Sequence, residues 1–129
     1  MGISPQNHVL LVAQEFDVGI RFVRVDAHGD PGDGEEFVVP NGKFLVVTDV
    51  DWACSAGPPD SMQTLQVDIG DNRPGFESTV ILNHQGSGGA SEAMTSGFVV
   101  ASGGILTVDI HPGATLGDVI IRGYLCRAS

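Results

Sequence analysis

The sequence has few cationic residues and no long apolar run, and each shortage narrows what the protein can do. Six Lys and Arg residues stand against 16 Asp and Glu residues, which gives a formal net charge of −10. Binding of nucleic acid needs clustered cationic side chains, and so does attraction to an anionic membrane surface, so we expect neither partner. No apolar segment approaches the roughly 20 residues of a membrane-spanning helix.

Cysteine is also scarce, with only Cys54 and Cys126 far apart in the chain. Neither belongs to a CxxC motif or has a neighbouring histidine, so metal binding and redox catalysis have little support. One interpretation is two separate structural thiols. The alternative is a disulfide, which would close a long loop and add about 4 kcal/mol in the chain-entropy description.

The first ten residues lack the basic segment and the long apolar core of a secretory signal. The apolar run 8–13 is short and is followed by Gln14 and Glu15. We therefore expect a cytoplasmic protein or one exported by a route that reads no such signal. A signal removed from the amino-terminal side is the third alternative.

What the sequence does contain is a series of short apolar segments rich in β-branched residues and bounded by Gly, Pro, Asn or Asp, which is typical of strands. Helical periodicity is almost absent. Eight or nine such segments, spaced by roughly 8–15 residues, predict one all-β domain over residues 1–129, an antiparallel β-sandwich. A jelly roll of eight strands fits the length, and an immunoglobulin-type sandwich is the alternative.

Individual segments carry more specific expectations. In 44–52 the even-numbered residues, ending in Trp52, form one face, and Asp49 and Asp51 lie on the other. The three glycines of 85–90 predict a loop. Residues 8–16 and 20–25 read as two further strands, which either begin the same sandwich or belong to an amino-terminal arm, 1–25, that pairs with a neighbouring subunit.

From residue 39 onward the chain resembles small, uncharacterised bacterial β-sandwich proteins of jelly-roll type. The segments that carry the resemblance are VPNGK (39–43), LVVTDVDW (45–52), TSGFVV (95–100) and RGYL (122–125). They describe a turn into a strand, a strand after a glycine and a last strand with tyrosine. The resemblance covers about residues 39–125 and implies a fold without implying an activity.

Asp49, Asp51 and Trp52 form the first candidate ligand-binding group. Two carboxylates two residues apart on one strand face can bind a cation or act as a pair, and an aromatic beside them suits a sugar ring. The simpler interpretation is that the carboxylates cover a solvated face. The alternation also places Trp52 on the apolar face, which favours a core position for the indole.

A second candidate group lies in the acidic, glycine-containing segment 28–36. Asp30, Asp33 and Glu35 offer oxygen ligands of the kind that calcium prefers. The residue order of an EF-hand loop is absent, so a solvated loop is the simpler interpretation. We expect no cofactor, with calcium as the one candidate.

Motifs for catalysis are missing. The four histidines are scattered without an H-x-H pair, and no serine lies in a G-x-S-x-G elbow. An acid pair assembled from separate strands, Asp51 with Asp68 or Asp109, is the remaining route to an enzyme. The sequence therefore favours a non-enzymatic β-sandwich that acts by self-assembly, as an oligomer or a structural subunit. The alternative is a module that binds a carbohydrate or a calcium-dependent ligand.

Overall fold

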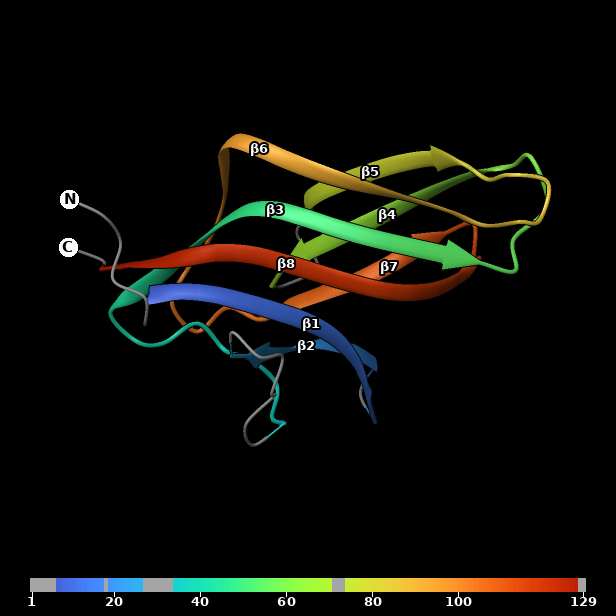
Figure 1. Ribbon diagram of the computed structural model, residues 1–129. Coiled ribbons are helices and arrows are strands. Elements are labelled where there is room, and N and C mark those ends of the chain that lie inside the picture. Colours follow the sequence, from blue (N-terminus) through green and yellow to red (C-terminus); the bar gives the residue numbers. More distant parts are fainter. Residues whose placement is uncertain (1–6, 18, 27–33, 71–73, 128–129) are drawn as a thin grey trace.

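The computed structural model describes residues 7–17, 19–26, 34–70 and 74–127, which consist almost entirely of strands and their connections. Eight strands run through these residues (Figure 1): β1 (His8–Phe16), β2 (Gly19–Val25), β3 (Lys43–Ser55), β4 (Met62–Ile69), β5 (Pro74–Ile81), β6 (Gly88–Val100), β7 (Leu106–His111) and β8 (Thr115–Arg127). The all-β prediction is confirmed. Within the described ranges, no helix has the length and apolar character needed to cross a membrane.

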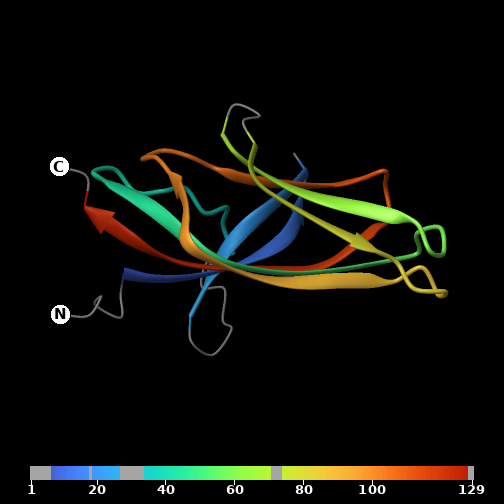
Figure 2. The same cartoon turned by 90° about the horizontal axis from the view of Figure 1, so that it is seen from above.

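The eight strands form one antiparallel sheet in the order β5-β4-β7-β2-β1-β8-β3-β6. The sheet curls until its edge strands, β5 and β6, approach each other, so it is nearly closed and barrel-like. Figure 2 shows β3, β6 and β8 along one side and β4, β5 and β7 along the other. One continuous sheet therefore stands where we expected the two separate sheets of a sandwich.

The predicted amino-terminal strands lie inside this sheet. β1 pairs with β2 on one side and with β8 on the other. β2 continues to β7 through the single register pair Arg21–Thr107. Residues 8–16 and 19–25 are thus strands of the same domain, as the first of the two interpretations has it, and they are not an arm outside it.

The predicted alternation fails in β3 because the strand contains a β-bulge. Val47 and Asp49 pair with the adjacent β8 residues 123 and 122, so Thr48 is an extra residue without a partner of its own. The register with β6 shifts at the same place. An extra residue reverses the face of every side chain that follows it.

The burial of β3 follows this reversal. Leu45 and Val47, before Thr48, are fully buried, and Val50 and Trp52, after it, are buried as well. The prediction that even-numbered residues share the inner face is therefore correct after the bulge and wrong before it.

β6 begins at Gly88, inside the segment for which the glycines predict a loop, and that prediction is wrong for residues 88–90. Gly89 pairs with Ala53 of β3. A Cβ atom at Gly89 would lie 2.4 Å from the carbonyl oxygen of Trp52. The close approach of two strands thus requires glycine here and outweighs its entropic cost of about 0.5–1 kcal/mol.

Apolar side chains from all the inner faces fill the interior as one cluster. Fully buried members come from β1, β2, β3, β4, β7 and β8, and include Leu11, Phe22, Val47, Leu65 and Ile121. The interior of the sheet is therefore a packed core, and candidate sites have to be sought on its outer surface and at its ends.

The packing of β8 against β3 predicts the effect of adding one methyl group. A Cβ atom at Gly123 would lie 2.2 Å from the carbonyl oxygen of Val46, so the backbone has to shift. We expect Gly123→Ala to lower the free energy of unfolding by about 1–3 kcal/mol, measured by urea denaturation. Gly117→Ala on the same strand is the control, because its Cβ would lie 3.3 Å from the carbonyl oxygen of Ala53. Equal losses in the two variants would contradict this steric account.

Candidate functional site

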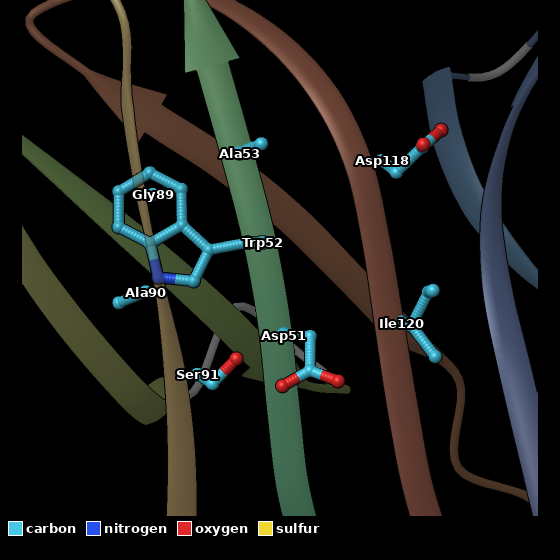
Figure 3. A pocket seen from close by; sticks show the side chains of 8 residues that line it. All are labelled: Asp51, Trp52, Ala53, Gly89, Ala90, Ser91, Asp118 and Ile120. Atoms are coloured by element: carbon cyan, nitrogen blue, oxygen red, sulfur yellow. The ribbon is translucent and has the colours of Figure 1, made fainter.

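A shallow pocket of about 440 Å³ lies on the outer face of β6, β3 and β8. Its volume is within the range of small-molecule sites, but it is open to solvent. Figure 3 shows its residues in three rows, one from each strand: Asp51, Trp52 and Ala53 from β3, Gly89, Ala90 and Ser91 from β6, and Asp118 and Ile120 from β8.

Backbone irregularities build this pocket. The bulge at Thr48 turns Asp51 to the outer face, and a second register shift separates Trp52 from Cys54 along β8. The short side chains of Ala53 and Ala90, with Gly89, leave the floor low. The result is an aliphatic floor with carboxylates and one hydroxyl at its rim.

Asp51 is the best-fixed carboxylate of the pocket. Arg122 donates from Nη1 to Asp51 Oδ2 at 2.6 Å. This hydrogen bond, together with one from Ser91, holds the pKa of Asp51 below its usual value against the opposing effect of burial. Much of the charge of Asp51 is thus compensated within the chain, whereas Asp118 stands exposed at the rim.

Asp49 is not part of the pocket. Its carboxylate accepts a hydrogen bond of 2.8 Å from the hydroxyl of Thr48. The structure therefore places Asp49 and Asp51 on one face, as predicted, but gives them different partners and includes only Asp51 in the pocket.

Trp52 borders the pocket with its indole turned inward, where it is 4% exposed. The ring nitrogen donates to Ser78 Oγ of β5 at 2.9 Å, and Ser78 Oγ donates to Glu92 Oε2 of β6 at 2.8 Å. The core position that the alternation favours is confirmed. A buried indole cannot serve as an exposed platform for a sugar ring.

The acidic segment 28–36 is described only in part. Asp30 and Asp33 lie outside the described residues. Glu35 is described and exposed, and the neighbouring Glu36 forms an ion pair of 2.8 Å with Arg21. In the described part of the chain, no three His, Cys, Asp or Glu side chains lie close enough together to hold a metal ion.

The acid pairs considered for an enzyme are not brought together. Asp51 lies on β3, whereas Asp68 lies on β4 and Asp109 on β7, which are five and four strands away from β3 in the order of the sheet. Asp68 is buried and accepts a hydrogen bond of 2.7 Å from Gln66. The hydrogen-bond partner of Asp68 is therefore a neighbour on its own strand and not a second acid.

Both cysteines are free thiols. Cys126 pairs in register with Phe44, at the opposite end of β3 from Cys54. Ten residues of strand span about 33 Å, far beyond the limit of about 7 Å between the Cα atoms of a disulfide. Burial raises the pKa of the Cys54 thiol. The structure thus shows two separate structural thiols and no disulfide between them.

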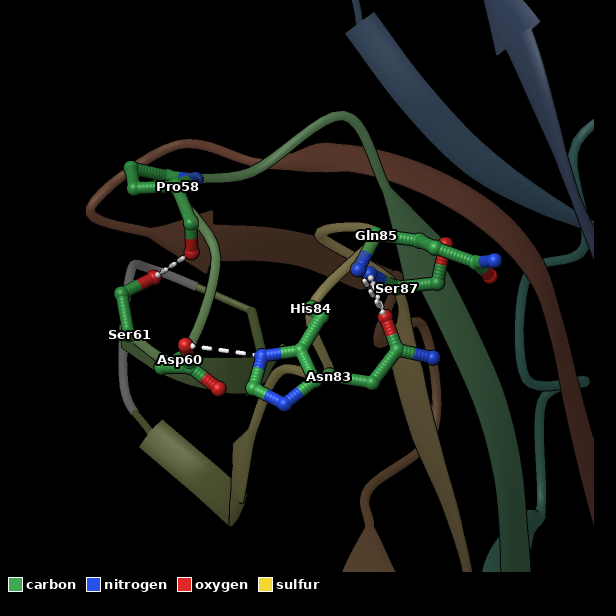
Figure 4. A network of polar contacts seen from close by, with 7 residues as sticks. All are labelled: Pro58, Asp60, Ser61, Asn83, His84, Gln85 and Ser87. Atoms are coloured by element: carbon green, nitrogen blue, oxygen red, sulfur yellow. Dashed lines mark hydrogen bonds and ion pairs between the residues drawn. The ribbon is translucent and has the colours of Figure 1, made fainter.

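A second surface, which the sequence interpretation missed, lies where β4 begins and β5 ends. Met62 and Ile81 are cross-strand partners there, and they are 62% and 71% exposed. Just beyond them, the His84 ring and the Asp60 carboxylate approach to 3.1 Å (Figure 4). We call these four residues, Asp60, Met62, Ile81 and His84, the β4–β5 end.

The backbone of the β4–β5 end is held by local hydrogen bonds. The Asn83 side chain accepts from the backbone nitrogens of Gln85 and Ser87 at 2.8 and 3.0 Å, which fixes the turn into β6 (Figure 4). Asp60 has a φ of 62°, a conformation that is uncommon for a residue other than glycine. The exposed side chains are therefore presented from a defined backbone.

The chain matches no protein-family model, and no curated protein matches it. The function is therefore inferred from these two surfaces and from the chemistry of their side chains.

The hydrogen-bond chain from Trp52 gives a test of how the sheet closes. Ser78→Ala leaves the indole nitrogen of Trp52 without its partner, and a buried unpaired donor costs about 1–3 kcal/mol. We expect a loss of that size in urea unfolding, followed by the fluorescence of this single tryptophan. Thr79→Ala is the control, because the neighbouring hydroxyl bonds only to Thr64 in an exposed pair. A loss no larger than that of Thr79→Ala would show that the chain does not hold the two strands together.

The lowered pKa of Asp51 predicts how stability depends on pH. A carboxylate with a lower pKa in the folded state stabilises the protein above its unfolded pKa, and this contribution is lost as pH falls through the folded pKa. We expect Asp51→Asn to lower the free energy of unfolding by about 0.5–1 kcal/mol at neutral pH, and this deficit to shrink as the pH falls below the unfolded-state pKa of about 3.9. Asp109→Asn, at an exposed strand position, serves as the control. A deficit in Asp51→Asn that persists at low pH would contradict this origin.

Proposed function

We propose that this domain acts without catalysis, by self-association, and that the β4–β5 end is its contact surface. The observation that carries the proposal is the exposed apolar pair Met62–Ile81. Contact of apolar side chains with water is unfavourable compared with their burial, and adjacent exposed apolar residues are typical of protein contact sites.

The position of the pair strengthens this proposal. Met62 and Ile81 are the two most exposed of the large apolar residues described, and they belong to neighbouring strands. Ile81 is at the end of β5, which is an edge strand of the sheet. A second copy can therefore approach the pair without displacing any strand of the first.

The net charge of −10 sets the conditions for association. Copies of an acidic chain repel one another, and salt shortens the range of this repulsion to about 8 Å at physiological ionic strength. Self-association is therefore expected to strengthen as the salt concentration rises.

We also propose that the nearly closed sheet is best regarded as a jelly-roll-like sandwich. Strand pairing is weak at two places around the sheet: β2 and β7 share one register pair, and β5 and β6 share none in the described residues. These two places divide the strands into β5-β4-β7 and β2-β1-β8-β3-β6, which would face each other as two layers across the core.

The pocket on β6, β3 and β8 favours a second candidate function, binding of a carbohydrate or a calcium-dependent ligand. Asp51, Ser91 and Asp118 would supply the polar contacts. The buried indole of Trp52 removes the aromatic platform that sugar sites commonly use, which places this candidate second. A rise in melting temperature with calcium or with a panel of sugars would favour it.

Self-association can be tested by replacing one exposed side chain. We expect the mass of the unmodified chain from light scattering to exceed the monomer value of 13.4 kDa and to rise with protein and salt concentration. Ile81→Lys should remain monomeric, because a charge would have to be buried in the contact. Val38→Lys is the matched control, since Val38 is 45% exposed in the segment before β3. A monomeric mass of the unmodified chain at every concentration would refute the proposal.

A further inference from the structure

We infer that the pocket on β6, β3 and β8 binds an organic cation, a primary alkylammonium group whose hydrocarbon chain lies on the pocket floor and whose charged end meets Asp118. This inference goes beyond the proposed self-association and does not depend on it. Three features carry it: a carboxylate that the chain leaves uncompensated, an aliphatic floor beside that carboxylate, and a shortage of metal ligands among the described residues.

Asp118 is presented to the pocket by an irregularity of β8. Between two consecutive register pairs of β3 and β8, β8 contains residues 117 and 118 where β3 contains only Ala53. Two residues opposite one is the arrangement of a β-bulge, which changes the direction of the side chains that it carries. Asp118 is exposed at this bulge and lines the pocket across from Ala53 (Figure 3).

The two carboxylates of the pocket differ in how far the chain compensates their charge. Asp51 has Arg122 as its ion-pair partner at 2.6 Å. Within the described residues, the Asp118 carboxylate has neither an ion-pair partner nor a hydrogen-bond partner. In a chain with a net charge of −10, such a carboxylate attracts a cation from solution. The charged end of the ligand is therefore assigned to Asp118.

The floor beside Asp118 is aliphatic and low. Ala53 pairs with Gly89 of β6, and Ile120 of β8 also lines the pocket. A Cβ atom at Gly89 would lie 3.4 Å from the Cβ of Ala53, and one at Gly117 would lie 3.8 Å from it, so the two glycines leave space on both sides. A hydrocarbon chain that covers this floor removes apolar surface from water. The pocket therefore suits an ammonium group that carries an alkyl chain.

The same features disfavour the other ligand classes considered for this pocket. Calcium takes about six to eight oxygen ligands, and the described part of the chain has no group of three His, Cys, Asp or Glu residues placed to hold a metal ion. A sugar ring finds no aromatic platform, because Trp52 is buried. An ammonium group carries only hydrogen-bond donors, and the Asp118 carboxylate supplies the acceptors that they need.

The first experiment follows the backbone amide shifts of the unmodified chain by NMR while pentylamine is added. We expect saturable shifts at Ala53, Gly89 and Ile120, with a dissociation constant of about 1 mM for a ligand of this size. 1-Pentanol has the same hydrocarbon chain without the charge and should bind about fivefold more weakly, which corresponds to one exposed ion pair. Equal binding of pentanol, or shifts confined to residues outside the pocket, would overturn the inference.

Two variants separate the contribution of the charge from that of the floor. Asp118→Asn should weaken the binding of pentylamine about fivefold and leave the binding of pentanol unchanged. Asp109→Asn, at an exposed position of β7, is the matched control and should bind as the unmodified chain does. Ala53→Leu covers the floor and should abolish the binding of both compounds. Pentylamine binding that is equally tight in Asp118→Asn and Asp109→Asn would contradict the assignment, and so would full binding by Ala53→Leu.

An alkylammonium group has two sources, a free amine and the lysine side chain of a partner protein. Titration with Nα-acetyllysine N-methylamide distinguishes them: a dissociation constant below that of pentylamine supports a lysine side chain as the ligand, and one above it supports a free amine. Failure of both compounds to bind overturns this inference. The light-scattering test of self-association with Ile81→Lys has its own outcome, because Ile81 does not line the pocket.

Discussion

A chain of two hydrogen bonds, from Trp52 through Ser78 to Glu92, joins three strands where the sheet fails to close. β5 and β6 follow each other in sequence, yet they form no ladder with each other in the described residues. Side chains bridge them instead. The stacked rings of Phe76 and Phe98, with centroids 6.0 Å apart, lie at the other end of the same seam. The core stays covered because these contacts hold two edge strands over it.

The bulge at Thr48 connects this closure to the outer surface. Without the extra residue, the side chains after it would change faces, and Trp52 would leave the core while Asp51 entered it. The hydrogen bond from Trp52 to Ser78 and the ion pair between Asp51 and Arg122 both require that Trp52 faces the core and Asp51 faces outward. The bulge thus positions both the hydrogen-bond chain that starts at Trp52 inside the sheet and the pocket on its outer face.

Much of the fold follows from local patterns in the sequence. The alternation in 65–69 and 106–110 predicts half-buried strands, and both segments lie in strands of the structure. Local sequence patterns fail to predict features that are determined by contact with a neighbouring strand. No local signal shows that Thr48 lacks a partner, or that Gly89 is a glycine because the carbonyl oxygen of Trp52 lies against it.

The candidate surfaces show the same division. The sequence predicts Asp51 as a site residue because two carboxylates two residues apart on a strand are visible in it, whereas Ser91 and Asp118 come from other strands and join Asp51 only through the strand register. Ile81 falls within a predicted strand, but alternation does not tell which face meets solvent. Its exposure is set by Val80 and Leu82, which turn inward.

The distribution of positive charge bears on where copies of this protein meet. In the described part of the chain, Arg21 forms an ion pair with Glu36 and Arg122 forms one with Asp51, so these two basic side chains neutralise local acids and offer little to another acidic molecule. Repulsion between acidic copies is expected to be weakest at a surface that carries few acids. The β4–β5 end combines that condition with the largest apolar exposure, and for this reason the proposed contact is assigned to it rather than to the acidic outer pocket.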